Sequence, residues 1–346
     1  MILYTIGEIM DNKIISVLGA GFSCIDIIKN GNKEELLLGG TAANVLSVLC
    51  QLGMQVTFLS ASYDDALGIW LRDALMRRGI QVVNFVESHL PVPRVIELLD
   101  PDGKHTFKTV CPICGKGLVK TVLPTTSQVV HLNDEVKKVN LFYYDRISEG
   151  IKKIAALNHT GWNFYEPNSC RVYKTFRDVA QISNILKFAA DRIPKPYIQS
   201  LLEDMQTSAV QLIIISNGEA GFRFSYRDST GRLCDWIDVA AVAAMNIVDD
   251  SGAGDWLTAS FLYAFLQEYP CFTEQLDGEK VRNMLESAKK VATFNCGFVG
   301  AQGVFKNEAA LRKLNEYFGW NLRMINDSVC SFEGDCQYCK SYCHDE

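Results

Sequence analysis

Residues 41–79 read TAANVLSVLCQLGMQVTFLSASYDDALGIWLRDALMRRG. Within this stretch, residues 41–53 space their apolar side chains about 3.6 apart and end at a glycine, which is typical of a helix. The run at 55–61 predicts a strand, and 67–79 predicts a second amphipathic helix closed by glycine. A β-branched run at 14–22, IISVLGAGF, predicts the strand that comes before. This alternation predicts a mainly parallel sheet with helices on its faces.

Residues 81–130 interrupt that alternation. The runs QVVNFVES (81–88) and RVIELLD (94–100) predict short strands, with a hairpin turn at residues 101–103. A β-rich interruption of this kind predicts a small sheet over one edge of the domain, and hence a lid. The α/β pattern then resumes with three predicted strands, at 137–145, 161–167 and 211–218, and with long helices around 254–268 and 279–296.

Composition and charge restrict the class of protein. The chain has 346 residues, 48% of them hydrophobic, which is enough for a sizeable core. Its 34 basic and 40 acidic residues argue against a broad surface for nucleic acid or anionic membrane. No apolar run approaches the roughly 18–20 residues that span a bilayer. Since the start lacks a basic region typical of a signal peptide, we expect a cytoplasmic protein.

Residues 247–255, IVDDSGAGD, precede the apolar helix pattern WLTASFLYAFL. Small residues leading into a helix start expose backbone N–H groups at its positive end, which predicts a cradle for a phosphate. Asp255 closes this cradle, where a carboxylate suits a general base that deprotonates an attacking hydroxyl. The alternative is a glycine-rich loop in which Asp255 only caps the helix.

Two segments near the start carry candidate sugar-binding groups. Gly39 and Gly40, in GGTAAN, allow a ligand to approach closely, and Asn44 can both donate and accept hydrogen bonds. Asp26, in GFSCID, can accept hydrogen bonds from sugar hydroxyls. The alternative for GGTAAN is a plain turn with an asparagine on a helix surface.

Taken in order, these segments resemble the ribokinase-type (PfkB) carbohydrate kinase family. The resemblance rests on GFSCID, GGTAAN, ISNGEAG, DDSGAGD and GFVGAQG, which together span roughly residues 14–305. It implies a ribokinase-like three-layer α/β/α sandwich with a mainly parallel central sheet and a small β-sheet lid. On this basis residues 1–320 form one kinase domain with the lid at about 81–130, and 321–346 form a cysteine-rich tail that we expect to be docked.

The resemblance also implies roles for individual residues. Asp255 would be the catalytic base, and the anion hole would consist of the amides of Gly252, Ala253 and Gly254. The acceptor sugar would be held by Asp26, Gly39, Gly40 and Asn44. The nucleotide would be bound by Asn217, Gly218, Gly221 and Ser251. ATP with Mg²⁺ is the implied phosphoryl donor, and the lid is a candidate surface for a homodimer.

The chain departs from the family pattern at two places. The family usually shows Asp-Thr where this chain has Asp249-Asp250, which adds a negative charge near the phosphate site. Family members often carry an Asn-x-x-Glu motif that helps to organise Mg²⁺, whereas ILKFAADRI offers only Ala189 and Arg192. Arg192 either binds phosphate directly or is a solvated or salt-bridged surface residue. The departures bear on metal handling and on the turnover rate.

The twelve cysteines fall into two groups. Six are scattered singly and are interpreted as small buried hydrophobic residues: Cys24, Cys50, Cys170, Cys234, Cys271 and Cys296. The other six are clustered in CPICG at 111–115 and in the tail at 330–343. Cytosolic thiols stay reduced, so such clusters point first to metal or redox chemistry.

The clustered cysteines predict a metal site. Cys111 and Cys114 have the spacing of a zinc knuckle, and Cys336 and Cys339 repeat it in the tail. The hypothesis is a four-cysteine zinc site that pins the tail to the lid. Substitute ligands are Cys330, Cys343 and His344. An iron–sulfur cluster would use the same thiolates, and disulfides or free thiols are further alternatives.

Other polar residues stand at predicted strand ends, where α/β folds place ligands. Asp145 and Arg146 follow one predicted strand and Glu166 follows another, so they either bind substrate or nucleotide or form a buried ion pair. His105 lies on the predicted lid hairpin, where it either touches substrate or is exposed.

The leading hypothesis is ATP-dependent phosphotransfer to a hydroxyl of a sugar or nucleoside. The rival is a nucleotide-binding regulator that has lost efficient catalysis and senses zinc or redox state through its cysteines. A zinc-dependent nucleic-acid binder fits poorly, because the chain is acidic and its predicted lid has few clustered cations.

Overall fold

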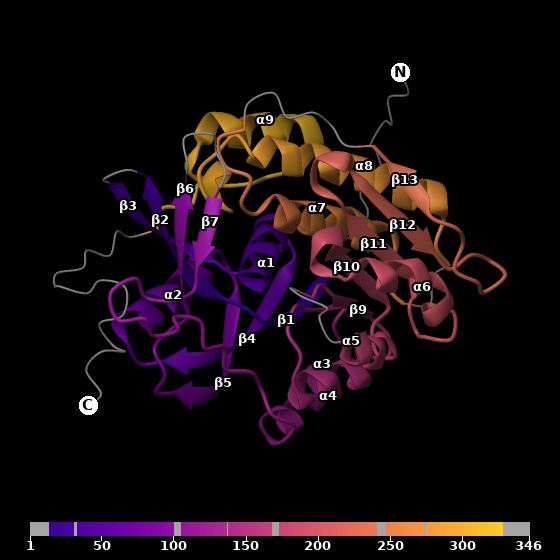
Figure 1. Ribbon diagram of the computed structural model, residues 1–346, viewed down its shortest axis with the longest axis horizontal. Coiled ribbons are helices and arrows are strands. Elements are labelled where there is room, and N and C mark those ends of the chain that lie inside the picture. Colours follow the sequence, from indigo (N-terminus) through magenta and orange to yellow (C-terminus); the bar gives the residue numbers. More distant parts are fainter. Residues whose placement is uncertain are drawn as a thin grey trace.

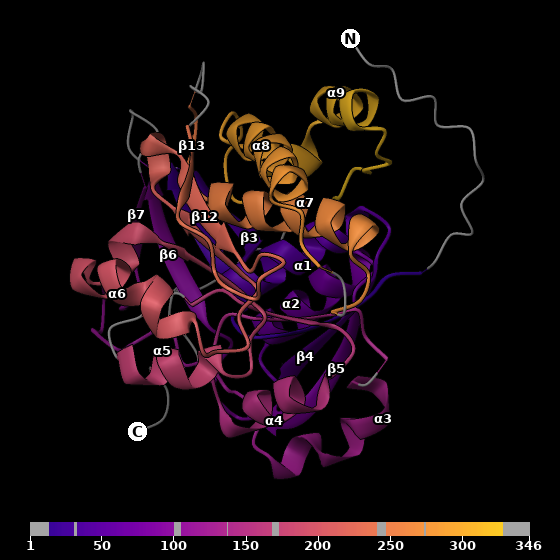
Figure 2. The same cartoon turned by 90° about the vertical axis from the view of Figure 1, so that its right-hand side faces the viewer.

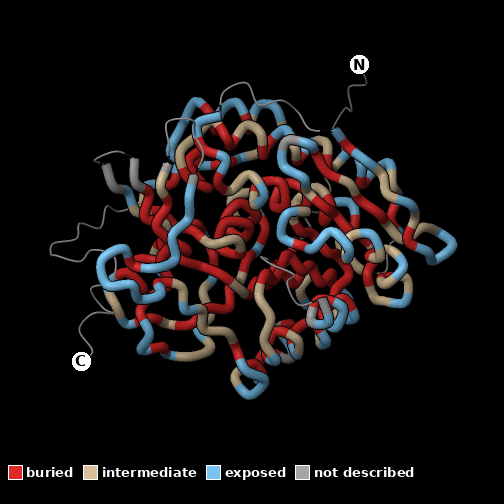
Figure 3. The backbone as a smooth tube through the Cα atoms, in the orientation of Figure 1, coloured by how far each residue is buried: buried red, intermediate tan, exposed pale blue. Residues whose placement is uncertain are grey.

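The structure, a computed structural model, describes residues 14–30, 33–99, 105–136, 138–167, 173–240, 247–272 and 275–327. Its elements form a large sheet between two layers of helices, with a small sheet at one edge (Figures 1 and 2). Buried backbone concentrates in the large sheet and in the helices packed on it (Figure 3).

The large sheet has nine strands. From one edge to the other they are β13 (Ile237–Val239), β12 (Phe222–Tyr226), β11 (Leu212–Ser216), β10 (Ile185–Ala189), β9 (Trp162–Tyr165), β8 (Leu141–Tyr144), β1 (Ser16–Ala20), β4 (Gln55–Tyr63) and β5 (Gln81–Ser88). Neighbouring strands from β11 to β5 pair in parallel, and β12 and β13 pair antiparallel. Every residue of β8 and β9 is buried, as expected for central parallel strands covered on both faces.

Helices cover both faces of this sheet. One face packs against α1 (Thr41–Gln51), α2 (Ala66–Arg77), α7 (Ala253–Glu268), α8 (Gly278–Asn295) and α9 (Glu308–Phe318). The other packs against α3 (Asn133–Val136), α4 (Glu149–Leu157), α5 (Tyr173–Ala180), α6 (Lys195–Met205) and the 3₁₀ helix η1 (Ser127–Leu132). Three short 3₁₀ turns complete the order: η2 (Ala190–Arg192), η3 (Gly218–Ala220) and η4 (Gly303–Lys306). In the part of the chain that the structure describes, no helix could cross a membrane.

The small sheet differs from the predicted lid at 81–130. It contains β3 (Lys33–Gly39), β2 (Cys24–Asn30), β6 (Arg94–Leu99) and β7 (His105–Lys108), in that order. The predicted strand 81–88 is instead β5, the edge of the large sheet, because it pairs in parallel with β4. The β2–β3 hairpin was missed, and it supplies half of the small sheet. Local pattern identifies a strand but not the sheet that it joins, so the predicted limits of the lid were wrong.

The chain after Trp320 does not leave the core at once. Leu322 and Ile325 are buried, and the Ile325 N–H donates to the Phe305 carbonyl at 3.1 Å. Asp327 forms an ion pair at 2.8 Å with Arg78, the residue that follows α2. The first part of the predicted tail is thus packed on the domain, and its clustered cysteines from Cys330 on lie outside the described residues.

Candidate active site

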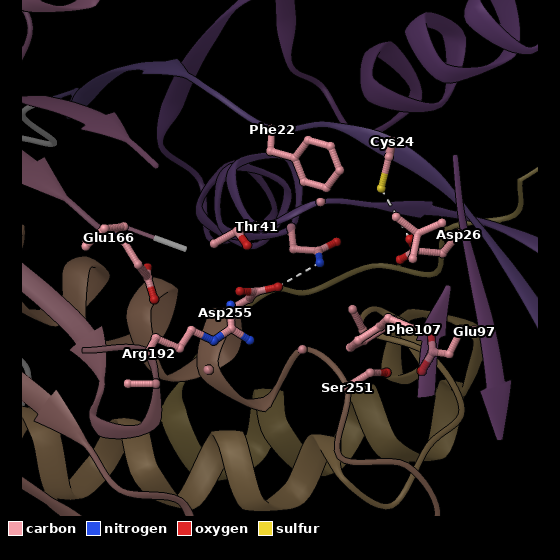
Figure 4. Close-up of a pocket in the computed structure, with 18 of the residues that line it drawn as sticks. Phe22, Cys24, Asp26, Thr41, Glu97, Phe107, Glu166, Arg192, Ser251 and Asp255 are labelled. Carbon is pink, nitrogen blue, oxygen red and sulfur yellow. Dashed lines mark hydrogen bonds between the residues drawn. The ribbon is translucent and has the colours of Figure 1, made fainter. Parts of the chain in front are cut away.

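A cavity of about 460 Å³ opens beside the carboxyl ends of the central strands (Figure 4). The segments after β1, β8, β9 and β10 contribute to its wall, opposite the start of α7 and the inner face of the small sheet. Ligands of open α/β sheets bind at this edge, because loops and helix starts with exposed N–H groups converge there.

The cavity collects most of the residues that the sequence singled out. Those that line it are Asp26, Gly40, Asn44, Ser251, Gly252, Gly254 and Asp255. Gly39 lies just behind, where an added Cβ would overlap the Asp26 carboxylate. The residues predicted to bind the nucleotide, Asn217, Gly218 and Gly221, form the loop at η3, directly after the lining residue Ser216.

The start of α7 has a backbone conformation that suits the predicted phosphate cradle. Gly252 precedes the helix with φ 71°, a left-handed conformation that favours glycine, and Ala253 begins it. A Cβ on Gly252 would lie 2.5 Å from the Cα of Ala301, so the loop has room only for glycine. The first N–H groups of a helix have no partners within it: that of Ala253 donates to the Asp250 carbonyl at 3.3 Å, and that of Gly254 can donate to a phosphate.

Asp249 holds the cradle loop in place from behind. Its side chain is fully buried and accepts hydrogen bonds from the N–H groups of Ser251, at 2.8 Å, and Gly300, at 2.6 Å. Asp249 thus connects the cradle to the segment after α8. The extra carboxylate noted in the sequence is Asp250, which is exposed and lines the cavity.

Replacing Asp249 by alanine is expected to lower the free energy of unfolding by about 3 kcal/mol, because it removes two hydrogen bonds to a buried charge. Urea denaturation measures the loss. Asp250→Ala is the matched control, and as an exposed substitution it should cost less than about 0.5 kcal/mol. Equal midpoints for the two variants would show that Asp249 does not support the loop.

Asp255, the candidate base, lies on the first turn of α7 and faces α1. The Asn44 amide Nδ2 donates to its Oδ2 at 2.7 Å (Figure 4). Burial raises the pKa of Asp255 to about 7, and the nearby carboxylate of Glu166 adds to the rise. The Asn44 hydrogen bond and the Lys187 ammonium lower the same pKa. A carboxyl group with a pKa near 7 is suited to accept a proton from an alcohol at physiological pH.

Lys187, which the sequence analysis missed, lies beside the base. It projects from the buried strand β10, forms an ion pair with Glu166 and donates to the Gly254 carbonyl at 3.3 Å. Glu166 is further held by the hydroxyls of Tyr143, at 3.0 Å, and Thr258, at 2.9 Å. The available signal was a lysine inside the apolar run ILKFA, since buried lysines are rare unless they are paired.

The strand-end residues form ion pairs at the cavity. Asp145 pairs with Arg146 at 3.3 Å and accepts the Phe22 N–H at 2.8 Å, which holds the connection after β1. Burial raises the pKa of Asp145 to about 6, and Arg146 opposes that rise. The Arg146 guanidinium lies 4.8 Å from the centre of the Phe22 ring, where both line the cavity. Glu166 pairs with Lys187 of the neighbouring strand, whereas Asp145 and Arg146 pair within one strand end; Arg146 and Glu166 also line the cavity, so a role in binding stays a prediction.

The small sheet presents one face to the cavity. Cys24 and Asp26 of β2, Val95 and Glu97 of β6, and Phe107 of β7 line it. The register places Asp26 opposite Val95 and Glu97 opposite Phe107, which keeps both carboxylates on that face. The Cys24 thiol donates to Asp26 at 3.2 Å, and burial raises its pKa well above the usual value.

The sequence predicts two metal ions, Mg²⁺ with the nucleotide and a structural Zn²⁺, and the described residues bear on each of them differently. They contain no group of three or more His, Cys, Asp or Glu side chains placed to hold an ion. Mg²⁺ commonly needs only one or two carboxylates besides nucleotide phosphates and waters. For zinc, Cys111 is buried and Cys114 exposed, while Cys336 and Cys339 lie outside the described residues. The four-cysteine site therefore stays a prediction.

Comparison with solved structures identifies the fold. A probable sugar kinase from Rhizobium etli is 16% identical, with a TM-score of 0.69, over 88% of this chain and 98% of that one. A fructokinase with bound ATP from Xylella fastidiosa is 16% identical, with a TM-score of 0.66 over 83% and 93%. An adenosine kinase from Sinorhizobium meliloti is 17% identical, with a TM-score of 0.64 over 83% and 95%.

Comparison of sequences gives a narrower match. No match was found among curated proteins. Residues 177–307 match the family described as pfkB family carbohydrate kinase, and this segment contains both Lys187 and the cradle before Asp255. The predicted resemblance is therefore confirmed: the chain has the ribokinase-like fold, and its residues 177–307 match the pfkB carbohydrate kinase family.

Proposed function

We propose that this protein transfers a phosphoryl group from ATP to a hydroxyl of a sugar or nucleoside. One observation carries the proposal: the Asp255 carboxylate lies on the first helical turn after the Gly252–Gly254 cradle, in the same cavity as Asp26 and Asn44. A base, a phosphate cradle and hydroxyl-binding groups thus share one space. The pfkB match and the kinase fold support the same reaction class.

The cavity residues have two roles in this reaction: to deprotonate the acceptor hydroxyl and to stabilise the transferring phosphoryl group. Bound ATP supplies the γ-phosphoryl group. Asp255 takes the proton of the acceptor hydroxyl, whose oxygen forms the new bond to phosphorus as the bond to the ADP oxygen breaks. The amides of Gly252, Ala253 and Gly254 stabilise the charge on the transferring group. Asp255 then releases its proton to solvent, and the phosphorylated acceptor and ADP leave.

Phosphate binding would rely on this chain's own cations as well as on the cradle. Lys187 and Arg192 both line the cavity, and the Arg192 side chain extends into it (Figure 4). Arg192 stands where the family motif has its carboxylate, so a cation replaces a group that helps to organise Mg²⁺. We assign no residue as a Mg²⁺ ligand.

The end of the cavity beside the small sheet, which we call the acceptor end, favours substrates that carry no phosphate of their own. Asp26 and Glu97 place two carboxylates on the small-sheet face; Arg146 also lines the cavity and pairs with Asp145, as Lys187 pairs with Glu166. Carboxylates accept hydrogen bonds from hydroxyls and repel phosphates. The aromatic rings of Phe22 and Phe107 add apolar surface for a sugar face or a base.

The test is transfer from labelled ATP to a panel of matched acceptors, such as fructose with fructose 6-phosphate and adenosine with AMP. We expect transfer to unphosphorylated acceptors, with kcat/KM at least about tenfold higher than for the phosphorylated member of each pair. The absence of transfer to every polyol, sugar and nucleoside would refute the proposed function. Preference for the phosphorylated acceptor would refute only the assignment of the acceptor end.

Two further proposals concern other parts of the chain. The regulatory alternative needs the tail cysteines, and the predicted zinc site needs Cys336 and Cys339, all outside the described residues. Metal analysis of the purified full chain, compared with Cys111→Ser, tests the zinc site directly. A homodimer through the small sheet is likewise a proposal, which sedimentation can test.

A further inference from the structure

A continuous line of buried polar side chains joins the candidate base to the C-terminal segment. Asn44 Nδ2 donates to Asp255 at 2.7 Å, and Asn44 Oδ1 accepts from Gln302 Nε2 at 2.8 Å. Gln302 Oε1 accepts from Arg78 Nε at 2.8 Å. Arg78 then donates to both carboxylate oxygens of Asp327, at 2.9 and 2.8 Å. We call these five residues the amide relay.

The residues on either side of the two amides, Arg78 and Asp255, determine how each amide group is oriented. Arginine can only donate hydrogen bonds, so Gln302 must turn its oxygen toward Arg78. The Gln302 amide nitrogen then faces Asn44, which must accept through its own oxygen. That leaves the Asn44 nitrogen for Asp255, whose Oδ2 accepts its hydrogen bond. Each amide thus has one orientation that satisfies both of its neighbours.

We propose that Gln302 and Arg78, anchored by Asp327, are positioning residues that hold Asn44 as a donor toward Asp255. The proposal rests on the proposed function, in which Asp255 is the base. Asn44, Gln302 and Arg78 are 4%, 6% and 4% exposed, so little water can replace a lost partner. A reversed Asn44 would place its oxygen against the Asp255 carboxylate and its nitrogen against the Gln302 nitrogen. Both pairs are mismatched, which makes the observed orientation the stable one.

The charges around Asp255 explain why a fixed donor is useful there. Burial, Glu166 at the end of β9 and Asp145 at the end of β8 all raise the pKa of Asp255. Only the Asn44 hydrogen bond and Lys187 of β10 oppose them among the main influences. Other charged groups line the same cavity: Asp26, Glu97, Arg146, Arg192 and Asp250. A donor that could turn around would let the base stay protonated at neutral pH.

The relay also connects the base with the segment that leads into the cysteine-rich tail. Asp327 is the last described residue, and its side chain is 6% exposed in its ion pair with Arg78. Arg78 and the neighbouring Arg77 lower the pKa of Asp327, so it stays ionised as the acceptor that anchors the line. The end of the domain therefore contributes to the orientation of groups at the active site.

The experiment compares pH profiles of kcat for Gln302→Met, Gln302→Glu and the wild type. Methionine removes both hydrogen bonds at similar volume. Glutamate accepts from Arg78 and from Asn44 at once, which turns the Asn44 oxygen toward Asp255. We expect the acidic limb to move up by about 0.5–1 pH unit in Gln302→Met and further in Gln302→Glu, with kcat recovering at high pH. The loss of kcat at pH 7 should be about two- to sixfold for methionine, as the smaller ionised fraction of Asp255 requires.

Gln51→Met is the matched control. Gln51 donates to the Arg78 backbone carbonyl at 3.1 Å, so this variant makes the same chemical change beside the relay but outside it. Its acidic limb should coincide with that of the wild type. A limb that stays in place in Gln302→Glu, or that moves equally in Gln51→Met, would overturn the proposal. If Gln302→Glu does not fold, as judged by its circular dichroism, Gln302→Met decides alone.

A second readout does not depend on turnover. The carboxyl carbon of ¹³C-labelled Asp255, assigned by its loss in Asp255→Asn, titrates directly in an NMR experiment on the full chain. Its midpoint should rise in both Gln302 variants and stay constant in Gln51→Met. If the wild type phosphorylates no acceptor, the proposed function fails, while this titration still tests the relay. An unchanged midpoint in both Gln302 variants would refute the relay even in an active enzyme.

Discussion

Asp255→Asn is expected to lower kcat by about 10³-fold, the middle of the range for loss of a general base. The amide keeps the shape of the side chain but cannot accept the hydroxyl proton. Acceptor and nucleotide affinities should change little, because the cradle and Asp26 remain in place. Steady-state kinetics with a saturating acceptor measures the loss.

The wild-type pH profile provides the companion measurement. With a pKa of about 7, Asp255 becomes protonated as the pH falls through neutrality, so kcat should decline below about pH 7. Asp250→Asn is the matched control, since it removes a cavity carboxylate that we do not assign as the base. That control should stay within about threefold of the wild type. A comparable loss in both variants would show that charge in the cavity, rather than the base, governs turnover.

The same substitution has a predictable effect on stability. The folded-state pKa of Asp255 is raised from 3.8 to about 7, so protonation favours the folded chain. This contribution is fully present below the unfolded value and is lost as the pH rises through about 7. Since the amide of Asp255→Asn cannot ionise, the variant should melt higher than the wild type at pH 8 and similarly at about pH 3.5. Thermal melts at the two pH values check the direction.

Lys187→Met is expected to lower kcat by about 10²-fold or more. Two causes act together. The ammonium group lies at the cradle, where it can neutralise charge on the transferring phosphoryl group, and it lowers the pKa of Asp255. Its removal also leaves Glu166 as a buried unpaired charge, which typically costs about 3–5 kcal/mol of stability. Kinetics and urea denaturation measure the two effects separately.

The double variant Lys187→Met/Glu166→Gln separates the two causes. Replacing Glu166 by its amide removes the unpaired charge, so stability should recover relative to Lys187→Met alone. Activity should stay low if Lys187 acts on phosphate. Recovery of both stability and kcat would show instead that Lys187 serves only as the partner of Glu166.

Much of the fold could be predicted from local pattern. Helical spacing closed by glycine predicted α1 and α2 to within two residues at each end. The glycine-rich run before WLTASFLYAFL predicted the start of α7 and the exposed N–H groups there. These features are local, because backbone conformation over a few residues follows from side-chain size, capping and periodicity.

The candidate site was predicted only in part. Asp26, Asn44 and Asp255 stand in recognisable motifs and do line one cavity. Lys187 stands in no motif, and Gln302 stands in GFVGAQG, to which no role was assigned; their contribution depends on partners 21 and 258 residues away in the chain. The predicted limits of the lid were wrong for a similar reason, because the sequence pattern of β5 does not indicate whether this strand pairs with β4 or with β6.

Local sequence thus predicted many of the secondary elements, the glycine-rich start of α7 and the candidate base, but not the β2–β3 hairpin. Only the tertiary structure decided which sheet each strand joined, and which groups surround Asp255. The physical reason is that the pKa of a carboxyl group and the orientation of an amide depend on atoms within a few ångströms. In this chain those atoms come from α1, α2, β9, β10 and the segment after α8, which folding alone brings together.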